Sequence, residues 1–249
     1  MIQDVLEILN HSESVFFALG IAYLLQVSVY FIICGLVVLI CHILLKVGGI
    51  GELLDDIKLK PNQVKKEIKL SLISAFIYAT FLLACIRLSP STVPVSWFEG
   101  GVQFVLFMLF YDVMNYLTHR LFHNPRLRRF HQHHHGSVRV TPWSSACLHP
   151  VEAMANQVPF LIFVLILPVS SLMIVSFYVF LMLGMAIAHS NYNPLANLSG
   201  CVWLKRYLSF HQVHHKLGSV NYGFLGTHWD YVFATSFIGS KASTEENSV

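Results

Sequence analysis

Long runs of apolar residues constrain the fold of this chain more than any other feature of its sequence. Residues 14–45 would form a helix about 48 Å long at ~1.5 Å per residue. The hydrocarbon core of a bilayer is about 30 Å thick, so this helix must tilt, protrude or break, and Gly35 is a candidate for a break. Residues 68–88 and 101–118 each have the length of one span. With 55% hydrophobic and 12% charged residues, the chain has the composition of a membrane protein.

The fourth apolar run, residues 157–188, is too long for one upright span. Pro168 lies near its middle, and a proline removes a hydrogen bond from a helix interior. We therefore expect a tight hairpin or re-entrant pair that returns the chain to the side where it entered. The sequence predicts an all-α integral membrane protein with about four transmembrane helices or helical hairpins and a cytoplasmic, histidine-bearing helical cap.

The charges of the connecting segments predict the orientation of the chain. Residues 46–67 and 119–156 carry clusters of lysine or arginine, whereas residues 89–100 contain neither. By the positive-inside rule, the two basic segments face the cytoplasm. If residues 157–188 return, residues 189–249 lie on that side as well, and all histidine clusters face the cytoplasm. The expected location is a bacterial inner membrane or the endoplasmic reticulum.

The overall composition excludes several other kinds of site and partner. The net charge of +3 is small and the basic residues are dispersed, which does not support nucleic-acid binding. The five cysteines form no CxxC pair and no disulfide framework. A bound metal would therefore be held by nitrogen and oxygen ligands rather than by thiolates.

A polar stripe follows the third apolar run. His119 and His123 are spaced i, i+4, so they share one face of a helix, and Tyr116 and Asp112 continue that face into the membrane. An aspartate within a span is costly and is a functional candidate. We expect Asp112 to accept the N–H of a metal-ligating imidazole and so to fix which ring nitrogen faces the metal. The alternative is a plain polar end of a membrane helix.

Two copies of a second histidine pattern follow. His131-Gln132-His133-His134-His135 contains HxxHH, in which residues 131, 134 and 135 share a helical face and His133 points elsewhere. Residues 211–215, HQVHH, repeat the pattern, and His189 lies between the copies at the end of the last apolar run. Nine histidines on one side of the membrane fit two metals with four or five nitrogen ligands each, because one catalytic zinc needs about three protein ligands. The candidate ligands are His119, His123, His131, His134, His135, His189, His211, His214 and His215.

In order and spacing, these motifs resemble the fatty acid hydroxylase/sterol desaturase superfamily of integral-membrane di-iron enzymes. The resemblance covers roughly residues 105–238. It rests on DVMNYLTHRLFH (112–123), FHQHHH (130–135), HPVE (149–152), HSNYN (189–193), HQVHH (211–215) and NYGFLGTHWDYVFAT (221–235).

The resemblance implies a division of the chain into two regions. Residues 1–100 would form an N-terminal membrane anchor with two spans and a basic cytoplasmic loop. Residues 101–249 would form the catalytic region, whose cytoplasmic cap carries the nine histidines over a dimetal centre. One departure concerns Asn193, because the lipid 2-hydroxylase branch has a second HxxxH histidine at this position. Asn193 could hold a bridging water or leave that metal more open.

The implied activity is that of a membrane-bound di-iron oxygenase. It would use O2 to hydroxylate or desaturate a lipid, such as a sterol or a fatty acyl chain, that reaches the metals from the bilayer. Two iron ions in an imidazole shell supply oxidising power toward a C–H bond that no protein side chain has. The sequence contains no haem segment, no cysteine cluster and no GxGxxG motif, so two electrons per turnover must come from a separate reductase with cytochrome b5 or ferredoxin.

Two alternative functions from other classes of protein remain open. A zinc-dependent membrane hydrolase needs fewer ligands and a carboxylate base, but the chain has no HExxH, and Glu152 is the only acidic residue in 119–156. A metal transporter or sensor predicts ionisable residues along several spans, where only Asp112 qualifies.

Overall fold

Membrane-length helices form the body of the molecule. The computed structural model describes residues 2–197, 200 and 202–237, and four of their helices are long and apolar enough to cross a bilayer. These are α2 (Val15–His42), which continues into a π-helical turn (Ile43–Val47), α3 (Gln63–Leu88), α4 (Trp97–Phe122) and α7 (Ser171–Ala188). The all-α membrane architecture is therefore confirmed. The helix α2 runs through Gly35 without a break.

The expected helix pair is also present. The helix α6 (Pro150–Ile166) precedes α7, and residues 167–170 connect them. The helix α6 begins with Pro150 in its first turn, where a proline costs no hydrogen bond, and it ends before Pro168, which cannot continue a helix. Phe160 of α6 packs on Tyr178 of α7 with ring centroids 4.2 Å apart. The chain thus turns back at residues 167–170.

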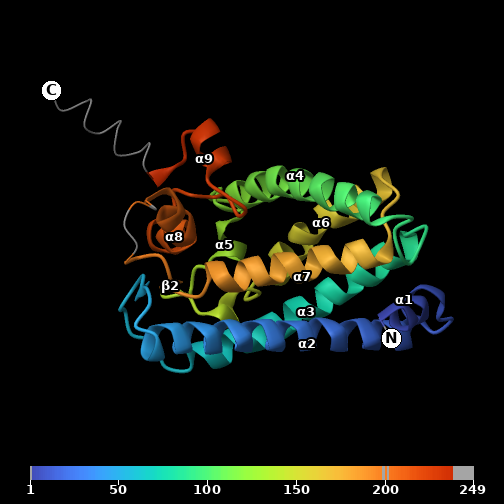
Figure 1. The fold of residues 1–249 in the computed structure, drawn as a ribbon, viewed down its shortest axis with the longest axis horizontal. Coiled ribbons are helices and arrows are strands. Elements are labelled where there is room, and N and C mark those ends of the chain that lie inside the picture. The colour runs from blue at the N-terminus through green and yellow to red at the C-terminus, as the bar shows by residue number, and fades with distance from the viewer. Residues whose placement is uncertain (1, 198–199, 201, 238–249) are drawn as a thin grey trace.

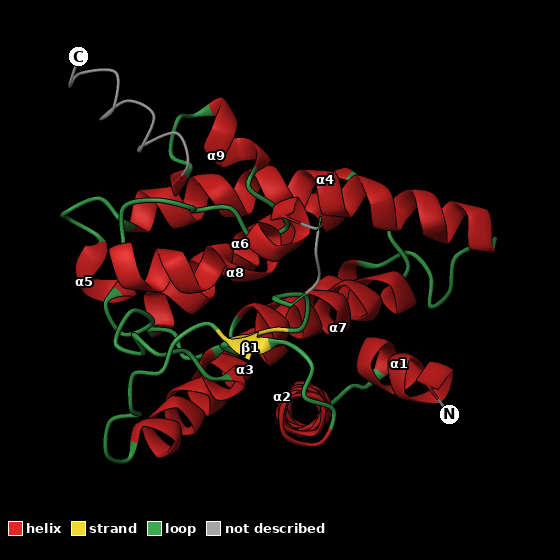
Figure 2. Ribbon diagram, turned by 60° about the vertical axis from the view of Figure 1, so that its left-hand side comes forward, coloured by secondary structure: helices red, strands yellow, loops and turns green. Residues whose placement is uncertain are grey.

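The short elements gather at one end of the bundle. They comprise α5 (Arg128–His131), a 3-10 turn (Pro142–Ser144), α8 (Val202–Leu217) and α9 (His228–Val232). Figure 1 shows α5, α8 and α9 at the end opposite α1 (Ile2–His11). At this end β1 (Glu52–Leu53) pairs antiparallel with β2 (Tyr192–Asn193), with Glu52 opposite Asn193 (Figure 2). All the histidine motifs therefore lie at one end of the bundle.

Aromatic side chains make up the centre of the core. Phe107 of α4 is fully buried and stacks on Phe177 of α7 at 4.0 Å between ring centroids. Phe160 and Phe163 of α6 complete the cluster around it. The helix α4 is thus held against the consecutive helices α6 and α7 by one large aromatic contact, which fixes where their polar ends meet.

The loop after α2 is attached to the histidine-bearing end. The Arg139 guanidinium donates to the Ile57 carbonyl at 2.8 Å, and the Lys60 ammonium donates to the Gly136 carbonyl at 3.1 Å. The buried Asp55 carboxylate forms an ion pair with Lys216 of α8 at 2.6 Å. These contacts order the segments on either side of the two HxxHH motifs.

Candidate metal centre

Nine histidines from four segments of the chain converge in two groups. The first group contains His119, His123, His131, His135 and His214, and the second contains His134, His189, His211 and His215. Within each group, one nitrogen of every ring lies within 4.8 Å of the corresponding nitrogen of all the others. These nine residues are the ones singled out in the sequence. Whether each binds a metal stays a prediction.

Each HxxHH motif supplies both groups. In the α8 copy, His214 belongs to the first group, whereas His211 and His215 belong to the second. In the other copy, α5 ends at His131 and residues 132–135 form a turn, so His134 leaves the direction of its neighbours. The expectation that residues 131, 134 and 135 share one helical face was wrong, because the helix ends at the first of them, whereas the division of a motif between the two groups occurs in the unbroken α8 as well.

Helix ends contribute to the electrostatics of both groups. His119 lies in the last turn of α4 and His123 caps it, His189 caps α7, and His214 lies in the last turn of α8. The exposed carbonyls at a helix C-terminus carry partial negative charge and favour a nearby cation. Three helices thus direct their negative ends toward the histidines.

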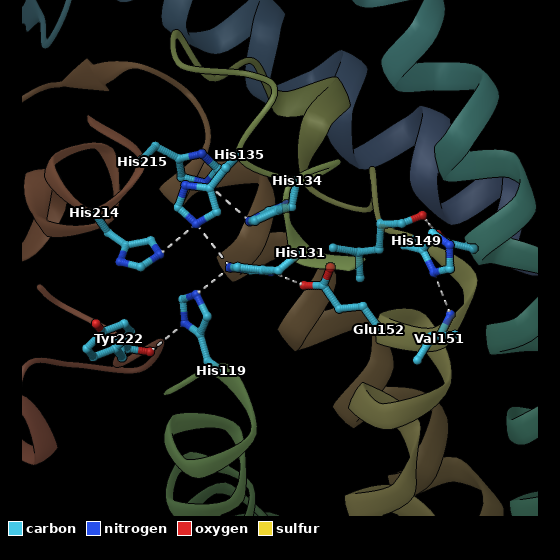
Figure 3. Close-up of polar contacts among 12 residues, drawn as sticks. His119, His131, His134, His135, His149, Val151, Glu152, His214, His215 and Tyr222 are labelled. Atoms are coloured by element: carbon cyan, nitrogen blue, oxygen red, sulfur yellow. Dashed lines mark hydrogen bonds and ion pairs between the residues drawn. The ribbon is translucent and has the colours of Figure 1, made fainter. Parts of the chain in front are cut away.

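The outer nitrogens of several rings have fixed hydrogen-bond partners (Figure 3 shows those of His119 and His131). The Nδ1 of His119 lies 2.7 Å from the Tyr222 carbonyl, and the Nδ1 of His214 lies 2.6 Å from the Val220 carbonyl. A carbonyl can only accept, so both Nδ1 atoms carry the hydrogen and both Nε2 atoms present a lone pair. The Nδ1 of His131 donates in the same way to Glu152 Oε1 at 2.6 Å.

His189 of the second group is oriented by a hydroxyl group. Its Nδ1 lies 2.7 Å from Ser144 Oγ, and that hydroxyl donates its own hydrogen to the Thr141 carbonyl. The Nδ1 of His189 is therefore the donor, and its Nε2 is left with a lone pair.

The inner nitrogens approach one another too closely to be stable without a cation. The Nε2 atoms of His119 and His131, both without hydrogen, are 3.2 Å apart. The Nε2 of His135 lies 3.0 Å from that of His131 and 3.0 Å from that of His214, and one hydrogen cannot serve both. Converging lone pairs repel each other unless a positive ion lies among them. The donor set therefore fits a metal that prefers imidazole nitrogen.

Protonation does not relieve this repulsion. Burial lowers the pKa of the His135 imidazole to about 4 and those of His123 and His189 to about 3. Burial also holds the pKa values of the second-group rings His134, His211 and His215 well below the ordinary range. The rings are neutral at pH 7, which is the form that binds a metal.

Glu152 is a site residue whose role the sequence reasoning missed. Its carboxylate is buried and contacts His131, and its second oxygen, Oε2, has no hydrogen-bond partner in the described part of the chain. A carboxylate on the outer nitrogen of a ligating histidine fixes the tautomer and makes the ring more basic. The signal was available, because Glu152 is the only acidic residue in 119–156.

Asp112 has other partners than expected. Its Oδ2 accepts from His228 Nε2 at 2.5 Å and from Trp229 Nε1 at 2.6 Å, and neither residue belongs to the two groups. Asp112 thus ties α4 to α9. The hydrogen bond predicted from Asp112 to a ligand imidazole is formed by Glu152 instead.

Asn193 also points away from the histidines. Its Nδ2 donates to the Lys205 carbonyl at 3.1 Å, and its Oδ1 accepts from the Leu195 amide at 3.0 Å. Both polar atoms are therefore engaged in the turn between β2 and α8. His133 lies outside both groups as expected, and His149 caps α6 through the Val151 amide.

A cavity extends from both groups into the helix bundle. His119 and His131 of the first group and His134 and His211 of the second lie in its wall. The rest of the wall comes mainly from α4, α6, α7 and residues 145–148, with one residue each from α2 and α3. A second, apolar cleft between α7 and α8 shares His211 and Phe224 with this cavity. Phe224 and His211 thus lie where the cavity and the cleft adjoin.

Comparisons with known proteins identify the family and several relatives of the chain. Residues 104–235 match the profile of the family described as "Fatty acid hydroxylase". The chain is 32% identical over 188 residues to a probable Delta(7)-sterol 5(6)-desaturase of Neurospora crassa, covering 70% of this chain and 52% of that protein. It is 28% identical over 220 residues to the Delta(7)-sterol 5(6)-desaturase of Leptosphaeria maculans, covering 84% and 58% respectively. The chain thus spans little more than half the length of these relatives. No solved structure is a significant match.

Proposed function

The chain belongs to the fatty acid hydroxylase family, and on this basis we propose that it is an integral membrane oxidoreductase that hydroxylates or desaturates a lipid. The observation that carries the proposal is that two groups of neutral imidazoles open onto one cavity within the membrane helices. Such a site brings a redox metal and an apolar substrate together. The relatives named as Delta(7)-sterol 5(6)-desaturases make a sterol the first substrate to test.

We propose that the nine histidines hold two iron ions, five imidazoles on one and four on the other. When bound, this pair supplies the activation of O2 and the removal of hydrogen from an unactivated C–H bond. Hydroxylation consumes O2, two electrons and two protons per alcohol and water formed. Desaturation consumes the same reactants and releases two waters with the alkene.

The protein's own groups position and tune this centre. The carbonyls of Val220 and Tyr222 hold His214 and His119 in one tautomer, and Glu152 holds His131. The aromatic side chains of the cavity, among them Phe160 and Phe224, exclude water from the space where the lipid carbon would lie. Exclusion of water protects a reactive oxidant from side reactions.

The lipid is proposed to enter from the bilayer through the cleft between α7 and α8. The side chains of Phe180, Leu183 and Ile187 line this cleft and are 42–43% exposed, on the side of α7 that would face lipid. Phe224 packs over Gly184, where an added Cβ would approach the ring to 3.1 Å. Movement of this ring would connect the cleft with the histidine cavity.

Electron supply, topology and domain roles complete the proposal. We propose that a separate reductase, with cytochrome b5 or ferredoxin, delivers the electrons. The histidine-bearing end would face the cytoplasm, because the loop after α2 and the α4–α5 segment carry the basic residues. Residues 1–100 would anchor the catalytic region, residues 101–249, in the membrane.

A comparative lipid profile tests the activity. Cells with and without the chain would be compared by mass spectrometry, alongside a His214→Ala variant that inserts in the membrane. A lipid gaining about 16 mass units marks hydroxylation and one losing about 2 marks desaturation. An unchanged profile in iron-supplied cells with an electron donor present would contradict the proposal. Lipid products of simple hydrolysis would favour the zinc hydrolase instead.

A further inference from the structure

A single amide side chain in the most apolar helix lines the histidine cavity. Gln26 is the only asparagine or glutamine of α2 (Val15–His42), and it forms part of the cavity wall. Its Nε2 is buried and has no hydrogen-bond partner among the described residues. A buried donor that lacks an acceptor is unfavourable, and a polar group inside a membrane span marks a functional site by default.

The position of Gln26 along the axis of the helix bundle follows from the contacts of Tyr30, one helical turn away. Tyr30, one helical turn nearer the histidines, donates to the Trp143 carbonyl at 2.8 Å. The next residue, Ser144, holds His189. One turn of helix is about 6 Å at ~1.5 Å per residue, so the Gln26 amide lies close to the level of the histidines but deeper in the membrane. Gln26 belongs to neither histidine group, and its unpartnered amide nitrogen lines the cavity where a bound lipid could reach it.

Among the described residues, the other unpartnered buried polar atoms of the cavity wall are Glu152 Oε2 and the Nδ1 atoms of His134 and His211, and all three lie on or against the histidine groups. The Tyr178 hydroxyl donates to Gln157 Oε1, and both residues line the wall. Within the described part of the chain, no lysine or arginine lines the cavity. The cavity thus offers a free amide donor in apolar surroundings without a cation, which suits a neutral oxygen acceptor and not a carboxylate.

We propose that the Gln26 amide donates a hydrogen bond to a neutral oxygen of the lipid substrate, a hydroxyl or an ester carbonyl, and thereby sets which carbon faces the histidines. This inference rests on the proposed function for the identity of the ligand as a lipid. It makes Gln26 a positioning residue and gives the first membrane helix a part in substrate selection.

Binding to purified full-length protein tests the proposal independently of turnover. The probes form two pairs, cholest-7-en-3-ol with cholest-7-ene, and methyl stearate with octadecane, so that each oxygen-bearing lipid has an oxygen-free partner. We expect wild-type protein to prefer the oxygen-bearing member of one pair by about tenfold, and Gln26→Leu to reduce that ratio to about one. The pair that responds identifies the source of the oxygen.

Gln103→Leu is the matched control. Gln103 is also a buried glutamine in a membrane helix, but its amide bonds Glu99 at 2.9 Å and the Pro168 carbonyl at 3.1 Å, at the far end of the bundle. This variant is expected to keep the wild-type preference, and Gln26→Asn to keep part of it. Equal ratios in wild type and Gln26→Leu for both pairs would overturn the inference. Failure to oxidise any lipid, with the binding preference intact, would count against the proposed activity alone.

Discussion

Replacing Glu152 by glutamine should weaken metal binding without unfolding the protein. The Glu152 side chain is 5% exposed and contacts His131 Nδ1 at 2.6 Å. Burial raises the pKa of this carboxyl, but a cation among the first-group rings would favour its charged form, which makes His131 a stronger donor to a metal. Glutamine keeps an acceptor oxygen but loses the charge. Loss of such an outer contact typically lowers metal affinity about 10–100-fold, or about 1.4–2.7 kcal/mol. The short distance and the burial favour the upper half of that range.

The assay is competition for ferrous iron between the purified protein and a chelator, followed by metal analysis of the protein fraction. The comparison is made at the chelator concentration that removes half the iron from the wild-type protein. If Glu152→Gln retains as much iron as wild type there, the reasoning is refuted. Spectroscopic titration with cobalt gives a second measure, because the coordination of the first group should change and that of the second should not.

Glu67→Gln provides the control for loss of a buried carboxylate. Glu67 is 1% exposed and accepts hydrogen bonds from Gln63, Ser137 and Thr141, none of which is a candidate ligand. Its substitution should lower the melting temperature and leave iron affinity within about twofold of wild type, because it alters no contact of the nine histidines. Equal loss of iron in both variants would mean that Glu152 acts only through stability.

Three further predictions concern the histidines and Asp112. Metal analysis should give about two metals per wild-type chain. His134→Ala should bind fewer metals and His133→Ala the wild-type number, because only His134 belongs to one of the two groups. Asp112→Asn should lower stability by about 1–2 kcal/mol in thermal denaturation, through its bonds to His228 and Trp229, with unchanged metal content. The metal-free protein should lose stability as the pH falls below 6.5. The histidines of the unfolded chain bind protons in this range, whereas the buried histidines of the folded chain stay neutral. For buried His189, with a pKa lowered to about 3, the loss between pH 7 and pH 5 is about 2 kcal/mol. A melting temperature that rises over that interval would contradict the assignment of neutral rings.

The sequence predicted the set of nine histidines because regular helices make spacing informative. His211, His214 and His215 lie on a continuous helix, where intervals of three and four residues place side chains on one side. The same rule failed for residues 131–135, where the chain turns after one short helix. Periodicity describes the faces of a helix and does not show where a short helix ends. The division of each HxxHH motif between the two groups also required the fold, because it occurs in the continuous α8 as well as in the turn at 132–135.

The partners of Asp112 and His131 could not be read from spacing. Asp112 meets His228 across 116 positions of sequence, and His131 meets Glu152 across 21 positions that include a 3-10 turn and the start of α6. Both pairings depend on how separate helices pack. The sequence correctly indicated that a buried aspartate needs a partner, but several imidazoles could have supplied it, and the nearest in sequence was the wrong one.

The partners of the outer nitrogens also bear on the charge of the site. His119 and His214 donate to backbone carbonyls, which no side-chain substitution removes, and only His131 donates to a carboxylate. Two divalent ions among nine neutral imidazoles would carry four positive charges, and Glu152, whose pKa burial raises, is the carboxyl group that contacts one of the nine rings. Buried uncompensated charge is costly, so the helix C-termini and carbonyl dipoles must offset much of it. If the proposed iron ions are bound, a site of this kind should stabilise added electrons more than a carboxylate-rich site would, which suits the oxidoreductase activity proposed above.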